Sequence, residues 1–255
     1  MLICFDIGNS TVSIGCFGDN GLLYATSIPS NPRPNIEQWE GVFEALLKYG
    51  KKERYEVTGV AYSSVVPDIE EKVKEAAISY FGLEPYSVTI ASDLGLRVNV
   101  DHPEEVGADL LSDAVAAKKI SGGDTVIVDM GTATKIILLG EEGSFEGCTI
   151  GVGPGIAKKA LNLDTAALPE VEFSLPKKVL GKNTHDSINS ALFYGLSAEA
   201  RGLCDMIERE YGKPLHRVLT GGYANLIKEL LGEFSFYPDL ALYGVREVYL
   251  RNKKA

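Results

Sequence analysis

The segment FDIGNSTVSIG at residues 5–15 places a strand-like apolar start directly against an aspartate and a run of small polar residues. The apolar run that ends at Phe5 is typical of a buried strand, but Asp6 and the residues after it cannot fill a core. A carboxylate at the end of a strand costs free energy unless it is solvated, paired or bound to a cation. Taken alone, the segment is compatible either with a tight hairpin that has no chemical role or with a ligand-binding turn.

The segment TVIVDMGTATKIILLG at residues 125–140 repeats this design. In both copies a second apolar strand, a polar turn and a third strand follow the aspartate. The residues matched at a constant offset are Asp6 with Asp129, Gly8 with Gly131, and Thr11 with Thr134. Such a repetition is hard to explain by two independent hairpins, and it indicates two related halves with a shared function.

Strands and helices alternate along both halves of the chain. The predicted strands are 2–6, 11–17, 22–28, 56–65, 87–90, 125–130 and 216–220, and the predicted helices are 36–49, 68–81, 104–120, 155–163, 184–210 and 223–231. Residues 121–123, Ser-Gly-Gly, form a natural joint, since two consecutive glycines are poor in either helix or strand. The pattern predicts an α/β protein of two similar lobes, 1–121 and 122–255, with a cleft between them.

The charge of the chain argues against several kinds of partner. The 255 residues carry a formal net charge of −10, whereas nucleic-acid binding depends on clustered lysine and arginine. No apolar run approaches the ~18 residues of a membrane span, and the N-terminus reaches Asp6 too early for a signal peptide. We therefore expect a cytoplasmic protein that binds neither nucleic acid nor membrane.

The cysteines and histidines do not suggest a metal site. The cysteines are Cys4, Cys16, Cys148 and Cys204, and the histidines are His102, His185 and His216. The cysteines lack CxxC spacing, and three of them lie in strand-like segments, so we expect buried thiols in a reducing compartment. The histidines are too scattered along the sequence to predict a shared ligand set.

The paired aspartate turns are suited to phosphate chemistry. Two convergent carboxylates would repel each other, and a bound Mg²⁺ or monovalent cation would remove that repulsion. The short polar side chains beside them are Asn9, Ser10, Thr11, Thr132 and Thr134. Together with exposed backbone N–H groups, such a turn can hold an anion without a lysine. The GxxxxGK[ST] phosphate loop is absent.

Seven short motifs follow one another in a specific order and spacing. They are DIGNST at 6–11, SSVVP at 63–67, VGAD at 106–109, DMGTATK at 129–135, GCTIGVGPG at 147–155, GKNT at 181–184 and LTGG at 219–222. Together they resemble the type III pantothenate kinase family, over nearly the whole chain. That family is part of the actin, hexokinase and Hsp70 superfamily, whose two ribonuclease H-like lobes hold ATP in the cleft between them.

The resemblance implies an activity and a set of ligands. The activity is ATP-dependent phosphorylation of the primary hydroxyl of pantothenate, the first committed step of coenzyme A synthesis, in a C2 homodimer. Asp6 would hold the Mg²⁺ of the nucleotide through water, and Asp129 would lie at the monovalent cation, K⁺ or NH₄⁺, that the family requires. The residues expected to line the nucleotide are Gly8, Asn9, Ser10, Thr11, Gly131, Thr132, Thr134, Gly221 and Gly222.

The resemblance also assigns an acceptor side. Asp109 would be the general base, which orients the substrate hydroxyl and accepts its proton. Without the resemblance, its place near a helix start would make Asp109 a cap or a dipole partner. Gly107, Ala108 and Val100 would line the pantothenate pocket. Thr184 would reach the same substrate, although it also begins a predicted helix.

Two positions on the acceptor side depart from the family pattern. Leu110 stands where the usual Gly-Ala-Asp-Arg tetrad has arginine, and Val100 stands where a tyrosine normally precedes Asp-x-Pro. Three functions therefore stay open: a pantothenate kinase with a remodelled acceptor pocket, a kinase of another small hydroxylated metabolite, and a nucleotide-binding regulatory or accessory protein without turnover. The retention of Asp109 favours the two enzymes.

Overall fold

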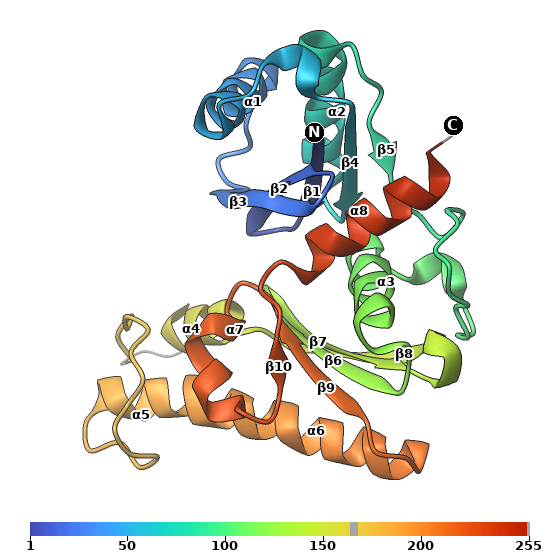
Figure 1. The fold of residues 1–255 in the computed structure, drawn as a ribbon. Helices are drawn as coiled ribbons and strands as arrows, with labels where there is room; N and C mark the ends of the chain where they lie inside the picture. Colours follow the sequence, from blue (N-terminus) through green and yellow to red (C-terminus); the bar gives the residue numbers. More distant parts are fainter. Residues whose placement is uncertain (164–167, 254–255) are drawn as a thin grey trace. The chain divides into compact units, whose positions relative to one another are not determined.

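The computed structural model describes residues 1–163 and 168–253, which form two five-stranded sheets with associated helices (Figure 1). The chain divides into two compact units, one made of Met1–Ile120 with Asp239–Ala255 and the other of Ser121–Pro238. The observed division after Ile120 lies one residue from the predicted joint. The final segment differs from the prediction, because it belongs to the first unit and not to a lobe 122–255.

The first unit is built on a sheet with the strand order β3-β2-β1-β4-β5. Its strands are β1 (Leu2–Ile7), β2 (Thr11–Gly18), β3 (Gly21–Pro29), β4 (Gly59–Ser64) and β5 (Tyr86–Ser87). Its helices are α1 (Ile36–Gly50), α2 (Pro67–Phe81), α3 (Ala108–Ser121) and α8 (Leu240–Asn252). Strand β1 runs antiparallel to β2 and parallel to β4.

The second unit repeats this topology, with the strand order β10-β9-β6-β7-β8. Its strands are β6 (Thr125–Met130), β7 (Ala133–Leu139), β8 (Phe145–Val152), β9 (His216–Thr220) and β10 (Ser235–Phe236). Its helices are α4 (Pro154–Leu163), α5 (Thr184–Ser190), α6 (Leu196–Tyr211) and α7 (Ala224–Ile227). Strand β6 runs antiparallel to β7 and parallel to β9, as β1 does to β2 and β4. The prediction of an α/β protein with two similar lobes is confirmed.

Several predicted helices are interrupted or shorter in the structure. The helix predicted at 104–120 is a 3₁₀ turn followed by α3, because Gly107 between them is poor in a helix interior. The other differences are a π-helical stretch at Ala191–Gly195 between α5 and α6, and a 3₁₀ turn at Lys228–Leu231 after α7. No element was predicted for β10 or α8.

The turn after the aspartate is one residue shorter in the second unit. Asp6 lies opposite Ser13 across β1 and β2, whereas Asp129 lies opposite Lys135 across β6 and β7. Because side chains alternate between the two faces of a strand, a slip of one residue changes which side chain stands beside the carboxylate. Ser13 and Lys135 are therefore equivalent in position and differ in charge.

The same slip corrects one match made from the sequence. Thr134 takes the position of Val12 in the observed register, so its match with Thr11 is wrong by one residue. Thr134 is buried, as Val12 is. The Thr134 hydroxyl donates a hydrogen bond to the carbonyl oxygen of Val152 at 3.2 Å. Thr134 therefore ties β7 to the end of β8 from a buried position.

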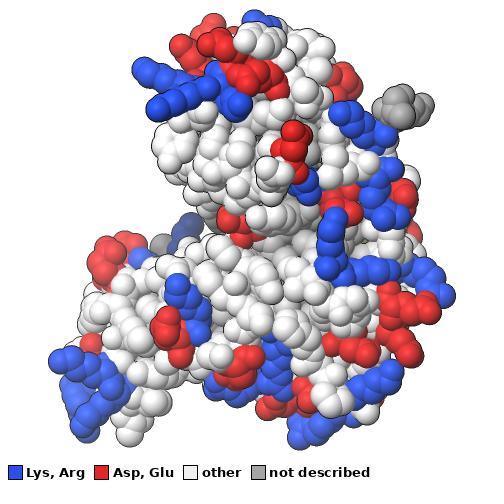
Figure 2. Space-filling view, in the orientation of Figure 1, with Lys and Arg blue, Asp and Glu red and all other residues white. Residues whose placement is uncertain are grey.

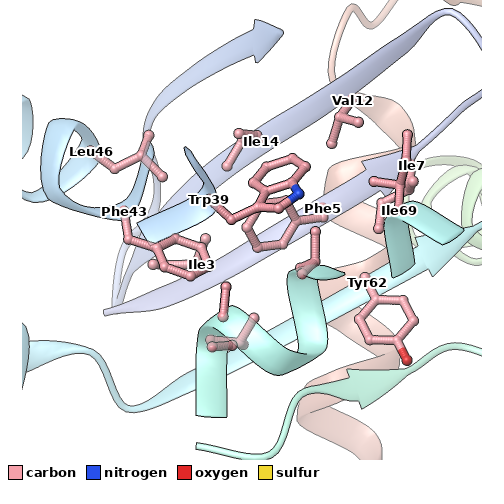
Figure 3. Close-up of a cluster of buried hydrophobic side chains, with 14 of the residues drawn as sticks. Ile3, Phe5, Ile7, Val12, Ile14, Trp39, Phe43, Leu46, Tyr62 and Ile69 are labelled. Atoms are coloured by element: carbon pink, nitrogen blue, oxygen red, sulfur yellow. The ribbon is translucent and has the colours of Figure 1, made fainter. Parts of the chain in front are cut away.

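Alternation along β1 divides the core of the first unit between the two faces of its sheet. Phe5 and its alternate neighbours face α1 and α2, where the ring of Phe5 meets Trp39 edge-on at a centroid distance of 6.0 Å (Figure 3). Cys4 belongs to the core on the opposite face, with residues of α3 and α8. Burial of each large apolar side chain contributes about 1.5–3 kcal/mol. By the same alternation, Asp6 is held on the α3 and α8 side.

The C-terminal helix α8 is joined to the first unit by a close helix crossing. A Cβ atom at Gly244 would collide with the backbone of Ser112 in α3, so only glycine allows this approach. Leu242 and Val245 of α8 share a buried cluster with Leu111 of α3. These contacts explain why α8 belongs with the first half of the chain.

The cysteines differ in exposure. Cys4, Cys16 and Cys204 are buried, as predicted. Burial raises the pKa of Cys16 to about 11 and that of Cys204 to about 12, and it holds the pKa of Cys4 well above its usual value. Cys148 is exposed, so the prediction of a buried thiol is wrong there. The reason is its place in β8, an edge strand of the second sheet.

The surface and the helices can be compared with the expected partners. On the face drawn in Figure 2, lysine and arginine side chains are interspersed with aspartate and glutamate. Within residues 1–163 and 168–253, no helix combines the length and apolar character that crossing a bilayer requires.

Candidate functional site

Asp6 lies near the carboxyl end of β1, beside the end of the parallel strand β4. Its Oδ1 atom accepts a hydrogen bond from the Ser63 hydroxyl at 2.8 Å, and the two residues are register partners. Ser63 is fully buried, while Asp6 is partly exposed. Loops at the carboxyl ends of parallel strands meet at one edge of a sheet, where α/β proteins bind ligands. A buried hydroxyl therefore orients a carboxylate that solvent can reach.

The turn after Asp6 is held by hydrogen bonds to its backbone. The N–H of Gly8 donates to the Thr11 carbonyl at 3.0 Å. The hydroxyl of Ser30 donates to the Gly8 carbonyl at 2.6 Å, and the Ser30 N–H donates to the Ser10 carbonyl at 3.0 Å. Asn9, Ser10 and Thr11 are exposed. This gives a fixed turn with short polar side chains at its surface, which is suited to an anionic ligand.

Asp129 takes the same place in the second unit but has a charged neighbour. The Nζ atom of Lys135 lies 2.5 Å from Asp129 Oδ2, and the two side chains are 14% and 12% exposed. They face each other because the residues are cross-strand partners in β6 and β7. Removing one partner from a buried ion pair typically costs about 3–5 kcal/mol. The carboxylate of the second unit thus has its counter-charge within the same sheet.

Two glycines pack directly against the aspartate turn of the second unit. Gly221 has a φ of +98°, and a Cβ there would collide with Asp129 Oδ1. A Cβ at Gly153 would collide with the carbonyl oxygens of Gly131 and Thr132. The loops LTGG and GVGPG therefore fix the DMGT turn from two sides, and neither position tolerates a side chain.

Asp109 lies in the first turn of α3, at the start of a largely buried helix. Its Oδ1 atom accepts a hydrogen bond from the Leu110 N–H at 2.9 Å. A Cβ at Gly107 would lie 2.5 Å from the same oxygen, so glycine makes room for the carboxylate. Asp109 is partly exposed, and the helix dipole favours its negative charge. The geometry suits both a helix-terminal carboxylate and a base that reaches a ligand.

The two unusual acceptor-side residues lie in different surroundings. Leu110 is 5% exposed, so the fold buries the position where the family pattern has arginine. Val100 is partly exposed and lies in the connection between β5 and α3. Replacement by leucine therefore removes a charge from an enclosed position.

Thr184 begins α5 and lines a groove of the second unit. The side-chain oxygen of Asn183 accepts the Asp186 N–H at 2.8 Å and caps the helix, which begins at Thr184 as predicted. The groove has a volume of about 690 Å³, and Lys182 and Ile188 also line it. Thr184 is exposed. A ligand could reach its hydroxyl from this groove.

The predicted site residues are distributed over both units. The structure brings together Asp6 with Gly8, Asn9, Ser10 and Thr11; Asp129 with Gly131, Thr132 and Gly221; Gly107 and Ala108 with Asp109; and Thr184 with its groove. Gly222 follows Gly221, with nothing within 4 Å of a Cβ at its position. Three residues that shape these groups were missed: Ser63, Lys135 and Gly153. Each lies inside a recognised motif, but its role depends on a neighbouring strand or loop that one segment of sequence does not reveal.

The residues present fit one of the two expected cations. Asp6, partly exposed and oriented by Ser63, fits a hydrated Mg²⁺ that takes its remaining ligands from water and phosphate. Within the described residues, no group of three or more histidine, cysteine, aspartate or glutamate side chains could form a metal cage. Asp129 does not fit an added monovalent cation, because the ammonium group of Lys135 lies against its carboxylate.

Solved structures share the fold. A Sinorhizobium meliloti protein assigned as a 2-dehydro-3-deoxygalactonokinase aligns with a TM-score of 0.58 at 12% identity, covering 100% of this chain and 98% of that one. The activator of the 2-hydroxyisocaproyl-CoA dehydratase from Clostridium difficile, with bound ADPNP, aligns with a TM-score of 0.51 at 10% identity, covering 100% and 98%. The fold is of the two-lobed actin and hexokinase type.

Sequence comparisons are more specific. A family model described as type III pantothenate kinase matches residues 2–206. The type III pantothenate kinase of Thermomicrobium roseum is 36% identical over 252 residues, which cover 98% of this chain and 97% of the relative. Because the match runs through both aspartate turns and the VGAD segment, the chain belongs to the type III pantothenate kinase family.

Proposed function

We propose that the protein transfers the γ-phosphoryl group of ATP to the primary hydroxyl of pantothenate, the first step of coenzyme A biosynthesis. The observation that carries the proposal is the pair of aspartate turns, placed at the same position in two sheets of identical topology. Family membership supports the acceptor, and nothing in the comparisons favours a regulatory protein without turnover.

In this proposal, residues of the two aspartate turns bind the nucleotide. Asp6 would hold Mg²⁺ through water, and the metal would supply positive charge beside the phosphates of ATP. The residues assigned to phosphate and adenosine are Gly8, Asn9, Ser10, Thr11, Gly131, Thr132, Gly221 and Gly222. Thr134, whose hydroxyl bonds to the Val152 carbonyl, supports the second turn from behind. The bound ADPNP of the dehydratase activator supports nucleotide binding by this fold.

The acceptor side depends on Asp109. Its carboxylate accepts the proton of the pantothenate hydroxyl and orients that oxygen, while Gly107 and Ala108 line the approach. Val100 and, in the second unit, Thr184 are the other residues assigned to this substrate. Phosphoryl transfer needs little covalent help from the protein, so such positioning is sufficient.

The replacement of the family's arginine by Leu110 weakens pantothenate binding in this proposal. A hydrogen bond to a charged group is worth about 1.5–3 kcal/mol, so the dissociation constant rises roughly 10- to 100-fold. A kinase with this deficit still turns over at high pantothenate concentration. We therefore expect the loss of the arginine to raise the Michaelis constant for pantothenate.

The proposed assembly is a C2 homodimer in the cytoplasm, with the partner subunit completing the acceptor pocket. Twofold symmetry is the commonest oligomeric arrangement. The net charge of −10 agrees with small-molecule partners and not with nucleic acid.

The test is phosphorylation of pantothenate by ATP and Mg²⁺, compared between Asp109→Asn and a matched variant. Asp109→Asn should lower turnover at least ~100-fold while ATP affinity stays nearly unchanged, because the base is lost and the phosphate turns are not. Asp68→Asn is the control, since Asp68 is the second residue of α2 as Asp109 is of α3. It should leave turnover unchanged.

Two results would count against the proposal. Equal activity in Asp109→Asn would make Asp109 a helix-terminal residue only. Absence of phosphopantothenate at saturating pantothenate, with ATP still bound, would remove pantothenate as the acceptor. A panel of other small hydroxylated metabolites would then separate a kinase of different specificity from a nucleotide-binding protein.

A further inference from the structure

The aspartate turn of the second unit contains its own cation. Lys135 Nζ lies 2.5 Å from Asp129 Oδ2, with both side chains largely buried. Gly221 packs against Oδ1 of the same carboxylate. The two oxygens are thus enclosed by an ammonium group on one side and by the backbone of the LTGG loop on the other.

The first unit shows that this cation is not required by the fold. Ser13 occupies the position of Lys135 opposite Asp6, in a sheet with the same strand order and directions. Serine in that place is compatible with the strand, the turn and the aspartate. The strand topology therefore does not explain the lysine at position 135, and its role must lie in the aspartate turn of the second unit.

The side chain of Lys135 has the chemistry of the ion that the family resemblance assigns to Asp129. A lysine ammonium is a compact single positive charge with three N–H donors, like an ammonium ion fixed to the chain by one bond. A second monovalent cation at the same carboxylate would meet a like charge within a few ångströms, in a site with little solvent to screen it.

We propose that the Lys135 ammonium group permanently replaces the monovalent cation at Asp129, so that this protein works without potassium or ammonium ions. The rate measurements that test this inference rest on the proposed kinase function. A measurement of cation binding to the protein tests it without that function. It also assigns Lys135 a positioning role, because it acts on the turn through Asp129.

The first measurement compares salts with the wild-type protein. The formation of phosphopantothenate is followed directly, in chlorides of potassium, ammonium, sodium or tetramethylammonium at constant ionic strength. The rates in all four salts should agree within about twofold, since the counter-charge at Asp129 is already present. Activation of the wild type by potassium or ammonium of tenfold or more would overturn the proposal.

The second measurement uses Lys135→Ser, which copies Ser13 of the first unit. In tetramethylammonium chloride its rate should fall at least about tenfold, as expected for loss of a charged contact. Potassium or ammonium should restore most of it. A loss that no cation restores would overturn the proposal and make Lys135 a ligand of the nucleotide or a purely structural residue.

The third measurement does not depend on turnover. Potassium should raise the thermal unfolding midpoint of Lys135→Ser above its value in tetramethylammonium, because a ligand that binds only the folded state stabilises it. The wild type should show no such difference. If the wild type phosphorylates nothing in any salt, the kinase proposal fails, while this comparison of midpoints still decides the role of Lys135.

The matched control is Lys213→Ser. Lys213 belongs to the same unit and pairs with Glu141 at 3.4 Å, but both side chains are well exposed. This variant should keep the wild-type rate and the wild-type indifference to salt. Should Lys135→Ser not fold, the salt dependence of the wild type decides by itself, since a requirement for potassium or ammonium contradicts a built-in cation.

Discussion

The two units have the same sheet topology, but the aspartate carboxylate in each has a different kind of neighbour. In the first unit, Asp6 accepts a hydrogen bond from the hydroxyl of Ser63 and lies opposite Ser13. In the second unit, Asp129 forms an ion pair with Lys135. Strand order and strand directions are identical, so the fold does not cause the difference. The difference comes from a turn that is shorter by one residue in the second unit and from the cross-strand neighbour of the aspartate, which is Ser13 in one unit and Lys135 in the other.

This difference shows that the repeated topology and the neighbouring side chain contribute separately to each site. The topology places a carboxylate at the end of the first strand in each unit, and the neighbouring side chain then decides what that carboxylate can bind. Asp6, oriented by a neutral hydroxyl, suits a hydrated divalent cation. Asp129, paired with a lysine, already has a positive charge beside it.

The strongest way to break the comparison is to neutralise each aspartate in turn. Asp129→Asn should destabilise the protein by about 3–5 kcal/mol, because it leaves the lysine ammonium buried without its counter-charge. Asp6→Asn should cost much less stability, since the Ser63 hydroxyl can donate to an amide oxygen as well as to a carboxylate. Chemical denaturation of both variants measures the two free energies of unfolding.

Equal losses of stability in the two variants would contradict the contrast between the units. A double variant gives the control: Asp129→Asn with Lys135→Met removes both charges of the pair. It should recover most of the stability, because replacing a whole buried ion pair by uncharged side chains is often nearly neutral.

A smaller effect is expected from the loop that packs on Asp129. Gly221→Ala should destabilise the protein by about 1–3 kcal/mol, since the new methyl group collides with Asp129 and the backbone of Met130. Gly222→Ala is the matched control, because nothing lies within 4 Å of a Cβ at that position. It should be nearly neutral. If both variants unfold at the same denaturant concentration, the LTGG loop does not restrain the second turn.

Labelling of the cysteine thiols perturbs the protein least, and it follows the opening of each unit separately. With a thiol reagent at pH 8, Cys148 should react at once, and the three buried cysteines at least ~100-fold more slowly. Their raised pKa lowers the thiolate fraction, and burial blocks the reagent. Mass spectrometry of peptides then compares labelling of Cys4 and Cys16 in the first unit with that of Cys204 in the second.

Different slow rates for the two units would mean that they open independently, as local unfolding allows. Simultaneous labelling of all three buried thiols would indicate a single cooperative opening. Rapid labelling of Cys204 would contradict the packing of α6 on the second sheet. The Cys148→Ser variant removes the fast phase and serves as the control.

Much of the fold was predictable because it follows from local patterns. The apolar run that ends at Phe5 and the repeat of an aspartate turn at Asp129 indicated two related sheets before any contact was known. The start of α5 at Thr184 was likewise predicted from the local sequence. These features depend on neighbours a few residues apart.

The remaining features depend on distant contacts. The return of α8 to the first unit rests on Gly244 meeting Ser112, and no local pattern encodes that meeting. The ion pair of Asp129 with Lys135 required the strand register, which a turn shortened by one residue changes. The exposure of Cys148 followed from the edge position of β8. The roles given to Asp109 and Thr184 stay predictions.

The position of α8 in the sequence has a consequence for synthesis. Its side chains complete a cluster in the first unit that also contains Leu2 and Cys4, yet the ribosome makes it after the whole of Ser121–Pro238. The second unit is contiguous in sequence, so its strands have all been made before α8 emerges. Until α8 has been made, the face of the first sheet that carries this cluster has α3 packed on it but lacks Leu242, Val245 and Val248. That face therefore stays partly exposed, a condition that favours binding by chaperones during translation.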